Sequence, residues 1–290
     1  MRMLTHGVVW LVAMACGLVS GAYPPGMPPP ELVGRMDAEL AGTCSALSNE
    51  SPLRVLRDAE SPYTALVHVP EAAGSAAQPL LLYLHGMGQS GDDILKTLAA
   101  PATGAPPVEL HHRRAPRELA ERFVMIAPQT NDGWLYEKLG RFLDFLLSSG
   151  QKSLGASLDP SRVYLTGHSI GGTAALLTAS KLRTADGRPR FAAVLPIAAS
   201  SLRTYTALKG IPVWLHHGAN DIVVPVRASD QAAEALRWLN PADGMLRYDR
   251  YPEAPTAPGR DPRTHRGHAS PILTFQNPEV YRWLLQQSVQ

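Results

Sequence analysis

The sequence predicts an α/β domain with a doubly wound, mostly parallel sheet that is flanked by helices on both faces. Continuous apolar runs, typical of strands buried on both faces, alternate along the chain with helical segments. One such run passes through a glycine-rich turn directly into a helix. The chain has 290 residues, of which 45% are hydrophobic and 18% charged, so it has enough apolar material for one large core.

The predicted elements follow from apolar runs and helical spacing. Strands are expected at 63–69, 80–84, 123–126, 163–165, 191–197, 211–215 and 245–251. Helices are expected at 92–99, 136–147 and 173–182, and in a C-terminal segment that Asn277 caps. Residues 102–122 are rich in proline, arginine and histidine, which favours a solvated surface excursion.

The N-terminus has the pattern of a signal peptide over residues 1–22. Arg2 is followed by the apolar run 7–19 and by small residues at 20–22, and that run is too short for a stable membrane span. We therefore expect export, to the periplasm or the medium, with a short anchor or a buried strand as the alternative. Cys16 only loosely matches a lipoprotein cleavage site, and cleavage after residue 22 would leave Cys44, of unassigned role, as the sole cysteine.

Residues 23–60 are interpreted as a proline-rich linker and N-terminal extension, with one helix between 31 and 47, and residues 61–290 as the catalytic domain. The formal net charge is only +2, which argues against a nucleic-acid or anionic-membrane partner. No organic cofactor is expected. The histidine pair 111–112 has no acidic or cysteine partner at the spacing of a metal site, and the pair 216–217 is interpreted as packing at the end of a strand, so no metal is expected either.

The strand-to-helix turn Gly167-His168-Ser169-Ile170-Gly171 matches the G-x-S-x-G nucleophile elbow. Glycines are needed there because the central residue is strained and its neighbours approach other elements closely. The helix N-terminus that follows favours negative charge at the serine oxygen. Ser169 is therefore the candidate nucleophile, and an ordinary glycine-rich turn is the alternative.

The loop after residues 80–84 contains Gly86, Gly88 and Gly91 and so satisfies G-x-G-x-x-G. A dinucleotide site would also need a long helix and a strand that delivers an acid about 20 residues on, and neither is expected here. Asp92 and Asp93 would moreover repel a pyrophosphate. The loop is better suited to stabilising an oxyanion with its backbone N–H groups.

An acid and a base follow the serine in the chain order of α/β-hydrolase triads. Asp221 lies on the loop after a late strand, and His265 and His268 lie on the loop after the last one. A helix cap or turn residue is the alternative for Asp221. Trp134, just beyond another strand, is interpreted equally as a substrate wall or as a loop anchor.

Five spaced motifs resemble the esterase and predicted-peptidase branch of the α/β-hydrolase superfamily, near the phospholipase/carboxylesterase and polyhydroxybutyrate-depolymerase-like families. They are Leu84-His85-Gly86-Met87-Gly88, Ala127-Pro128-Gln129, Gly167-His168-Ser169-Ile170-Gly171-Gly172, His217-Gly218-Ala219-Asn220-Asp221, and Gly267-His268 before Asn277-Pro278-Glu279. The resemblance covers residues 61–290 and implies the α/β-hydrolase fold.

The resemblance implies Ser169 as nucleophile, Asp221 as acid and His268 as base, with His268 favoured over His265. It also implies backbone N–H donors to the oxyanion at Met87 and Ile170. The chain departs from the families in having Ala-Ser-Pro at 269–271 and a longer, more basic loop at 253–266. That basic loop is compatible with an acidic substrate or with simple solvation.

The expected activity is hydrolysis of a carboxylic ester, small or polymer-linked, through an acyl-enzyme. The base must be neutral to accept a proton, so turnover is expected to rise from mildly acid to neutral pH. A serine peptidase or acyltransferase on the same fold, and a non-catalytic binding protein, are the alternatives. The acyl and alcohol groups and the oligomeric state are not determined by the sequence.

Overall fold

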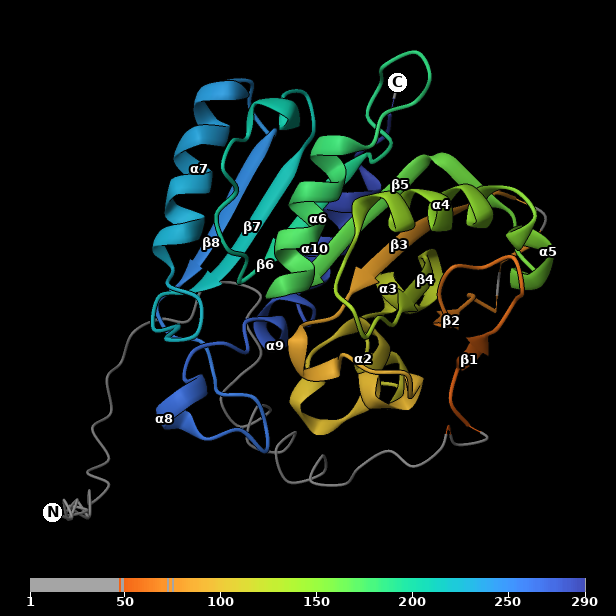
Figure 1. Ribbon diagram of the computed structural model, residues 1–290, viewed down its shortest axis with the longest axis horizontal. Helices are drawn as coiled ribbons and strands as arrows, with labels where there is room; N and C mark the ends of the chain where they lie inside the picture. The colour runs from red at the N-terminus through yellow and green to blue at the C-terminus, as the bar shows by residue number, and fades with distance from the viewer. Residues whose placement is uncertain (1–46, 48–49, 72, 75, 290) are drawn as a thin grey trace, which may run out of the picture.

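The computed structural model describes residues 47, 50–71, 73–74 and 76–289 (Figure 1). The expected signal peptide at 1–22, the linker from 23, both cysteines and the helix expected at 31–47, apart from Leu47, lie outside the described residues. These assignments stay predictions. In the part of the chain that is described, no helix is long and apolar enough to cross a membrane.

The described strands form one eight-stranded sheet in the order β1-β2-β4-β3-β5-β6-β7-β8. Their bounds are β1 Leu53–Leu56, β2 Ala65–His68, β3 Gln78–Leu84, β4 Val124–Pro128, β5 Leu158–His168, β6 Ala193–Ile197, β7 Val213–Gly218 and β8 Leu246–Tyr251. The pairs β1–β2 and β2–β4 are antiparallel, and the other neighbours are parallel. The predicted mostly parallel sheet is confirmed, and each expected strand is present with shifted ends.

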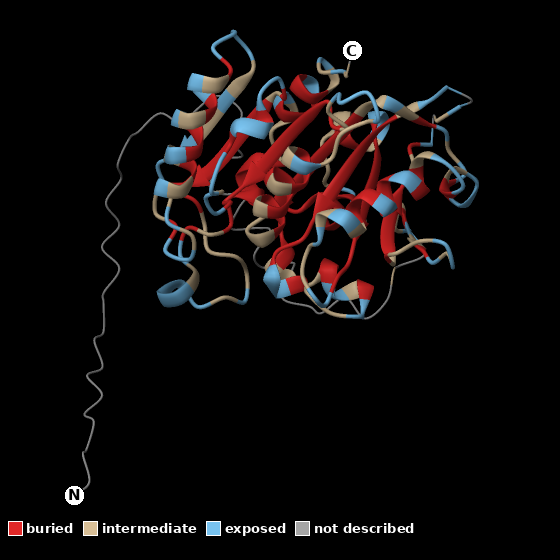
Figure 2. Cartoon of the chain, turned by 45° about the horizontal axis from the view of Figure 1, so that its top comes forward, coloured by how far each residue is buried: buried red, intermediate tan, exposed pale blue. Residues whose placement is uncertain are grey.

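Helices cover both faces of this sheet (Figures 1 and 2). The α-helices are α2 Pro106–His111, α3 Arg117–Arg122, α4 Tyr136–Leu147, α5 Gly150–Leu154, α6 Ile170–Lys181, α7 Arg227–Leu239, α8 Pro262–His265, α9 Pro271–Thr274 and α10 Pro278–Leu285. Short 3-10 helices are η1 Met87–Gln89, η2 Ile94–Leu98, η3 Ala100–Ala102 and η4 Thr206–Leu208. Helices α4, α6 and α7 contribute to one hydrophobic cluster, and α2, α3 and α10 to another. The fold is therefore doubly wound.

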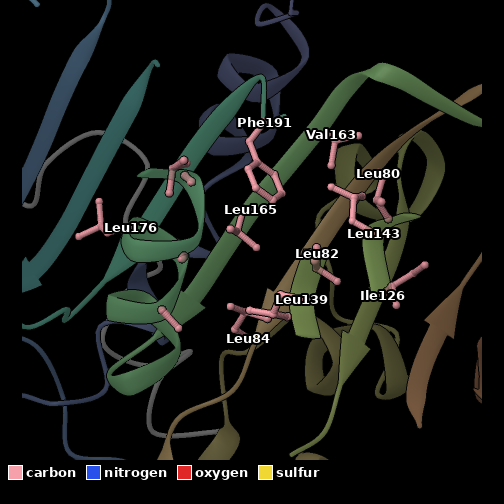
Figure 3. Close-up of a cluster of buried hydrophobic side chains, with 14 of the residues drawn as sticks. Leu80, Leu82, Leu84, Ile126, Leu139, Leu143, Val163, Leu165, Leu176 and Phe191 are labelled. Carbon is pink, nitrogen blue, oxygen red and sulfur yellow. The ribbon is translucent and has the colours of Figure 1, made fainter. Parts of the chain in front are cut away.

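Strand β3 shows how the two clusters arise from one apolar run. Leu80, Leu82 and Leu84 belong to the cluster of α4, α6 and α7, whereas Leu81 and Tyr83 belong to the opposite cluster. Successive side chains of a strand point to opposite faces, so a strand between two helical layers must be apolar at every position. Figure 3 shows the first of these clusters, with the three leucines of β3 beside side chains of α4 and β5.

Two predictions for the N-terminal third of the domain are wrong. The domain does not begin near residue 61, because β1 pairs with β2 from Leu53 onward. This edge strand is only four residues long, and exposed Arg54 interrupts its apolar pattern, so the sequence gives little indication of a strand here. Residues 102–122 are not a solvated excursion, because they contain α2 and α3 and several of their side chains are buried.

The parallel strands place the candidate chemistry at one edge of the sheet. The loops at 85–91, 129–135, 219–226 and 252–270 each follow the carboxyl end of β3, β4, β7 and β8, and Ser169 follows that of β5. In open α/β sheets, ligands bind outside the carboxyl ends of the strands. The site is therefore built from segments that are far apart in the sequence.

Candidate active site

Ser169 lies at the sharp turn between β5 and α6 in a strained backbone conformation. Its φ is +58° and its ψ −120°, a region that costs a non-glycine residue on the order of 1–3 kcal/mol. Surrounding contacts hold the strain, since Ser169 N–H donates to Ile197 O at 2.9 Å and Thr173 N–H donates to Ser169 O at 3.0 Å. The turn thus places a serine at the first turn of a helix, where the sequence predicted a nucleophile.

The glycines of this turn allow α6 to lie directly against the end of β3. A Cβ on Gly171 would lie 2.6 Å from His85 O, and one on Gly167 would lie 2.5 Å from Gly171 O. Real side chains do not fit at such distances from backbone atoms. The G-x-S-x-G spacing is therefore required by the packing of the helix on the strand.

The loop after β3 lies beside Ser169, because residues 86–89 and Ser169 line the same cavity. It forms the 3-10 turn η1, which starts at Met87, a residue whose surface is 70% exposed. The Gln129 side chain donates to Gln89 O at 2.9 Å and ties this turn to the loop after β4. Met87 and Ile170, the two predicted oxyanion donors, line one cavity together with Ser169.

The His85 side chain, at the start of the Met87 loop, is held in one tautomer. Its Nδ1–H donates to Gly86 O at 2.8 Å, while its Nε2 accepts the Thr130 N–H at 3.2 Å. Burial lowers the pKa of His85 to about 4, so the ring is neutral at neutral pH. The Trp134 indole N–H donates to His85 O at 3.0 Å, and the two rings pack with centroids 4.7 Å apart.

Asp221 is buried at the end of β7 and accepts hydrogen bonds at both carboxylate oxygens. Its Oδ1 accepts the N–H groups of Val223 at 2.8 Å and Val224 at 3.0 Å. Its Oδ2 lies 2.7 Å from Nδ1 of His268 and 3.3 Å from Nε2 of His217. Burial alone would raise the pKa of Asp221, but the hydrogen bonds from His217 and His268 outweigh it and hold the pKa well below its usual range.

The backbone around Gly267 joins the loop of His268 to the loop of Asp221. Gly267 has a φ of +75°, and a Cβ there would lie 2.5 Å from Asp221 N. Beside this contact, Ile222 N–H donates to Arg266 O at 3.1 Å. The two loops are therefore packed against each other, and the glycine that precedes His268 is needed for their close approach.

His168 and His265 have different places around His268. His168 Nε2–H donates to His268 O at 2.7 Å, and the two rings lie 4.7 Å apart. Burial, followed by the proximity of His268, lowers the pKa of His168 to about 3. His265 lines the same cavity as His268, and its Nδ1 lies 2.8 Å from Thr264 Oγ1.

Ser169 and His268 line a common cavity of about 450 Å³, together with Met87 and Ile170. The structure thus brings the predicted nucleophile, base and oxyanion loop together, with Asp221 behind His268. Trp134 is not among the residues that line this cavity, and its contacts are those of a loop anchor. Within the described residues, no three His, Cys, Asp or Glu side chains form a group that could hold a metal ion.

Two residues that contact Asp221 or His268 were given no role at the site from the sequence. His217 was interpreted as strand packing, although it lies four residues before Asp221 and its side chain returns to that carboxylate. His168 stands inside the elbow motif itself but had no assigned role. Arg260 also lines the cavity, in a basic loop for which the sequence left both an acidic substrate and simple solvation open. Only the four-residue spacing between His217 and Asp221 could have indicated such a contact from the sequence.

Residues 136–254 match the family model described as phospholipase/carboxylesterase. Among solved structures, a thermostable esterase aligns with 24% identity and a TM-score of 0.60, over 81% of this chain and 62% of that one. The chain thus spans less than two thirds of the length of that esterase. Esterase PE8 aligns with 23% identity and a TM-score of 0.41, over 63% of this chain and 86% of that one. A comparison with curated proteins gave no match.

These findings confirm the fold and the superfamily resemblance that the sequence predicted. The family match spans β5 to β8, which carry the elbow and the Asp221 loop. The match to the thermostable esterase extends the likeness in fold over most of the described chain.

Proposed function

We propose that this α/β-hydrolase-fold chain is an exported serine carboxylesterase. The observation that carries the proposal is the 2.7 Å hydrogen bond from His268 to Asp221, together with the cavity that His268 and the strained Ser169 both line. Export rests on the pattern of residues 1–22 alone. Mass spectrometry of protein recovered from outside the cytoplasm tests it, and retention of the full-length chain inside would contradict it.

In the proposed acylation step, His268 Nε2 takes the Ser169 proton while Oγ attacks the ester carbonyl carbon. Asp221 accepts from Nδ1 and so leaves the lone pair on Nε2 free. The carbonyl oxygen becomes an oxyanion, which the N–H groups of Met87 and Ile170 stabilise. The intermediate then expels the alcohol, which leaves with the proton that His268 carries.

In the proposed deacylation step, His268 takes a proton from a water molecule that attacks the acyl carbon on Ser169. A second oxyanion forms and is stabilised by the same two N–H groups. Its collapse releases the carboxylic acid and returns the proton to Ser169 Oγ, which restores the free enzyme.

The proposal is tested by labelling with an uncharged fluorophosphonate and by hydrolysis of p-nitrophenyl esters. We expect the wild-type chain to be labelled at Ser169 and to cleave the esters. Ser169→Ala should lose labelling and at least about 1,000-fold in kcat, because the remaining oxyanion donors and binding groups supply only part of the rate enhancement. Ser201→Ala, which removes an exposed hydroxyl elsewhere on the chain, is the matched control and should behave as wild type.

Equal labelling of wild type and Ser169→Ala would show that another residue is the nucleophile. Absence of both labelling and turnover in the wild type would contradict the hydrolase proposal. The ester panel is compared with peptide anilides, because a serine peptidase would cleave the anilides at comparable kcat/KM. Added methanol tests acyl transfer, which would yield methyl esters in place of the free acid.

A further inference from the structure

One arginine of the basic loop at 253–266 lines the candidate cavity. Arg260 is half-buried there, with Ser169 and His268 among the other lining residues. The other two arginines of the loop lie elsewhere: Arg263 pairs with Asp261 at 2.8 Å, and Arg266 is exposed. Of the three arginines in this loop, only Arg260 therefore lines the cavity.

The Arg260 guanidinium lies beside the proposed oxyanion loop. Its Nη2 is 2.5 Å from the position that a Cβ on Gly88 would take. Gly88 directly follows Met87, so the missing side chain leaves room for the cation next to the reacting centre. A turn holds the backbone of Arg260, whose N–H donates to Ala257 O at 3.1 Å.

The cavity offers Arg260 no anionic partner of its own. Among the described residues that line it, none is Asp or Glu. Much of the remaining lining is apolar and includes Met87, Ile170, Val223 and Val224. A guanidinium in such surroundings is suited to bidentate hydrogen bonds with a carboxylate or a similar planar anion.

We propose that the substrate is an ester that carries an anionic group, a carboxylate in the simplest case, and that Arg260 binds this group. The proposal rests on the proposed serine esterase function and makes Arg260 its specificity-determining residue. The apolar lining holds the uncharged body of the substrate, and the anion lies beside Gly88. The anionic group is carried by the acyl part or by the alcohol part of the ester, and the assay distinguishes the two.

The test measures kcat/KM for two matched pairs of esters with wild type, Arg260→Gln and Arg263→Gln. In the first pair, p-nitrophenyl hexanoate is compared with the mono-p-nitrophenyl ester of adipate, whose free carboxylate ends the acyl chain. In the second pair, phenyl acetate is compared with 4-acetoxybenzoate, which carries its carboxylate on the alcohol part.

We expect Arg260→Gln to lower kcat/KM by about 10- to 100-fold for the anionic ester of at least one pair, the range of a lost charge-assisted hydrogen bond. The neutral esters should lose less than about twofold. Arg263→Gln should affect neither, because its charge is paired outside the cavity. Raised ionic strength should weaken turnover of the preferred anionic ester alone.

Equal losses for anionic and neutral esters would overturn the proposal and assign Arg260 to the oxyanion. No loss for any ester would overturn it as well. Labelling of Ser169 by the uncharged fluorophosphonate separates these results from failure of the esterase function. If Arg260→Gln is labelled as wild type is, the hydrolase stands and only the substrate class is at issue; if wild type is neither labelled nor active, both proposals fall.

Discussion

Four N–H groups converge on the Asp221 carboxylate, from the backbone of Val223 and Val224 and from the rings of His217 and His268. An orienting acid needs only to hold one imidazole in the correct tautomer. The additional donors keep the buried carboxylate ionised and restrict its rotation. His217 is therefore expected to act through Asp221 without contacting the substrate.

The tautomer of His217 follows from its neighbours. Its Nε2 lies 2.9 Å from Val224 O and 3.3 Å from Asp221 Oδ2, both acceptors, so Nε2 must carry a hydrogen. Its Nδ1 lies 2.7 Å from Ser229 Oγ, which completes the ring's hydrogen bonds. His217→Leu removes the donor to Asp221 and is expected to lower kcat about tenfold, the cost of one hydrogen bond to a charged group.

The measurement is kcat and KM on a neutral p-nitrophenyl ester at several pH values. KM should stay within about twofold, because His217 does not line the cavity. His217→Gln, which retains an N–H donor, should recover most of the lost kcat. Equal loss in the Gln and Leu variants would assign His217 to packing alone.

The residues of the candidate site were predictable to the extent that chain order and motif spacing constrain them. Ser169, Asp221 and His268 each follow a strand at the same sheet edge, so their proximity follows from the parallel topology. Arg260 could not be predicted, because a 14-residue loop without strands has no register that would fix which arginine enters the cavity.

At the scale of elements, the contact between α6 and β3 controls the geometry of the elbow. Gly171 faces the backbone carbonyl of His85, and a Cβ there has no space. Strand β3 lies between β4 and β5 in the sheet, so it cannot shift away from α6. The packing of α6 on β3 thus requires a glycine at position 171, whatever the chemistry of Ser169.

Gly171→Ala is expected to destabilise the fold by roughly 3 kcal/mol or more, because the methyl group collides with backbone that cannot repack. Gly74→Ala is the matched control, since a Cβ at Gly74 meets no atom within 4 Å. Thermal unfolding of both variants is compared with wild type. An unchanged melting temperature for Gly171→Ala would contradict the tight approach of α6 to β3.

Elements were predictable where hydrophobic periodicity is long and unmixed. Helix α4 occupies the predicted residues 136–147, because its apolar positions repeat at helical spacing. Helix α2 was missed because it opens with Pro106 and Pro107, which usually indicate a turn. Proline is tolerated in the first helical turn, where its missing N–H has no intrahelical partner.

At the scale of the whole molecule, buried histidines make stability depend on pH. His85 and His216 are 1% and 0% exposed, and burial lowers their pKa values to about 4 and about 3. In an unfolded chain, histidine has a pKa near 6.5. Below that pH the unfolded state therefore binds more protons than the folded state, and stability falls as the pH falls.

Stability should be independent of these two groups above about pH 7 and should decline as the pH falls from 6.5 toward 4. At pH 5.5 the two groups together cost about 3 kcal/mol relative to neutral pH. Urea unfolding midpoints at several pH values measure this. His216→Asn should reduce the slope by about a third, because His85 and His168, whose pKa values are also lowered, remain. An unchanged slope would show that other groups dominate acid unfolding.

The loop that carries Arg260 begins and ends at the turn that carries Asp221. At its start, Asn220 exchanges two hydrogen bonds with the backbone of Ala254, at 2.8 and 2.9 Å. At its end, Arg266 O accepts the Ile222 N–H. A loop closed in this way is a self-contained excursion whose contents can be exchanged while its ends stay fixed. Residues 255–265 could therefore be replaced by another loop sequence to test new substrate preferences. The hydrogen bond between His268 and Asp221 lies outside the replaced segment and would be kept.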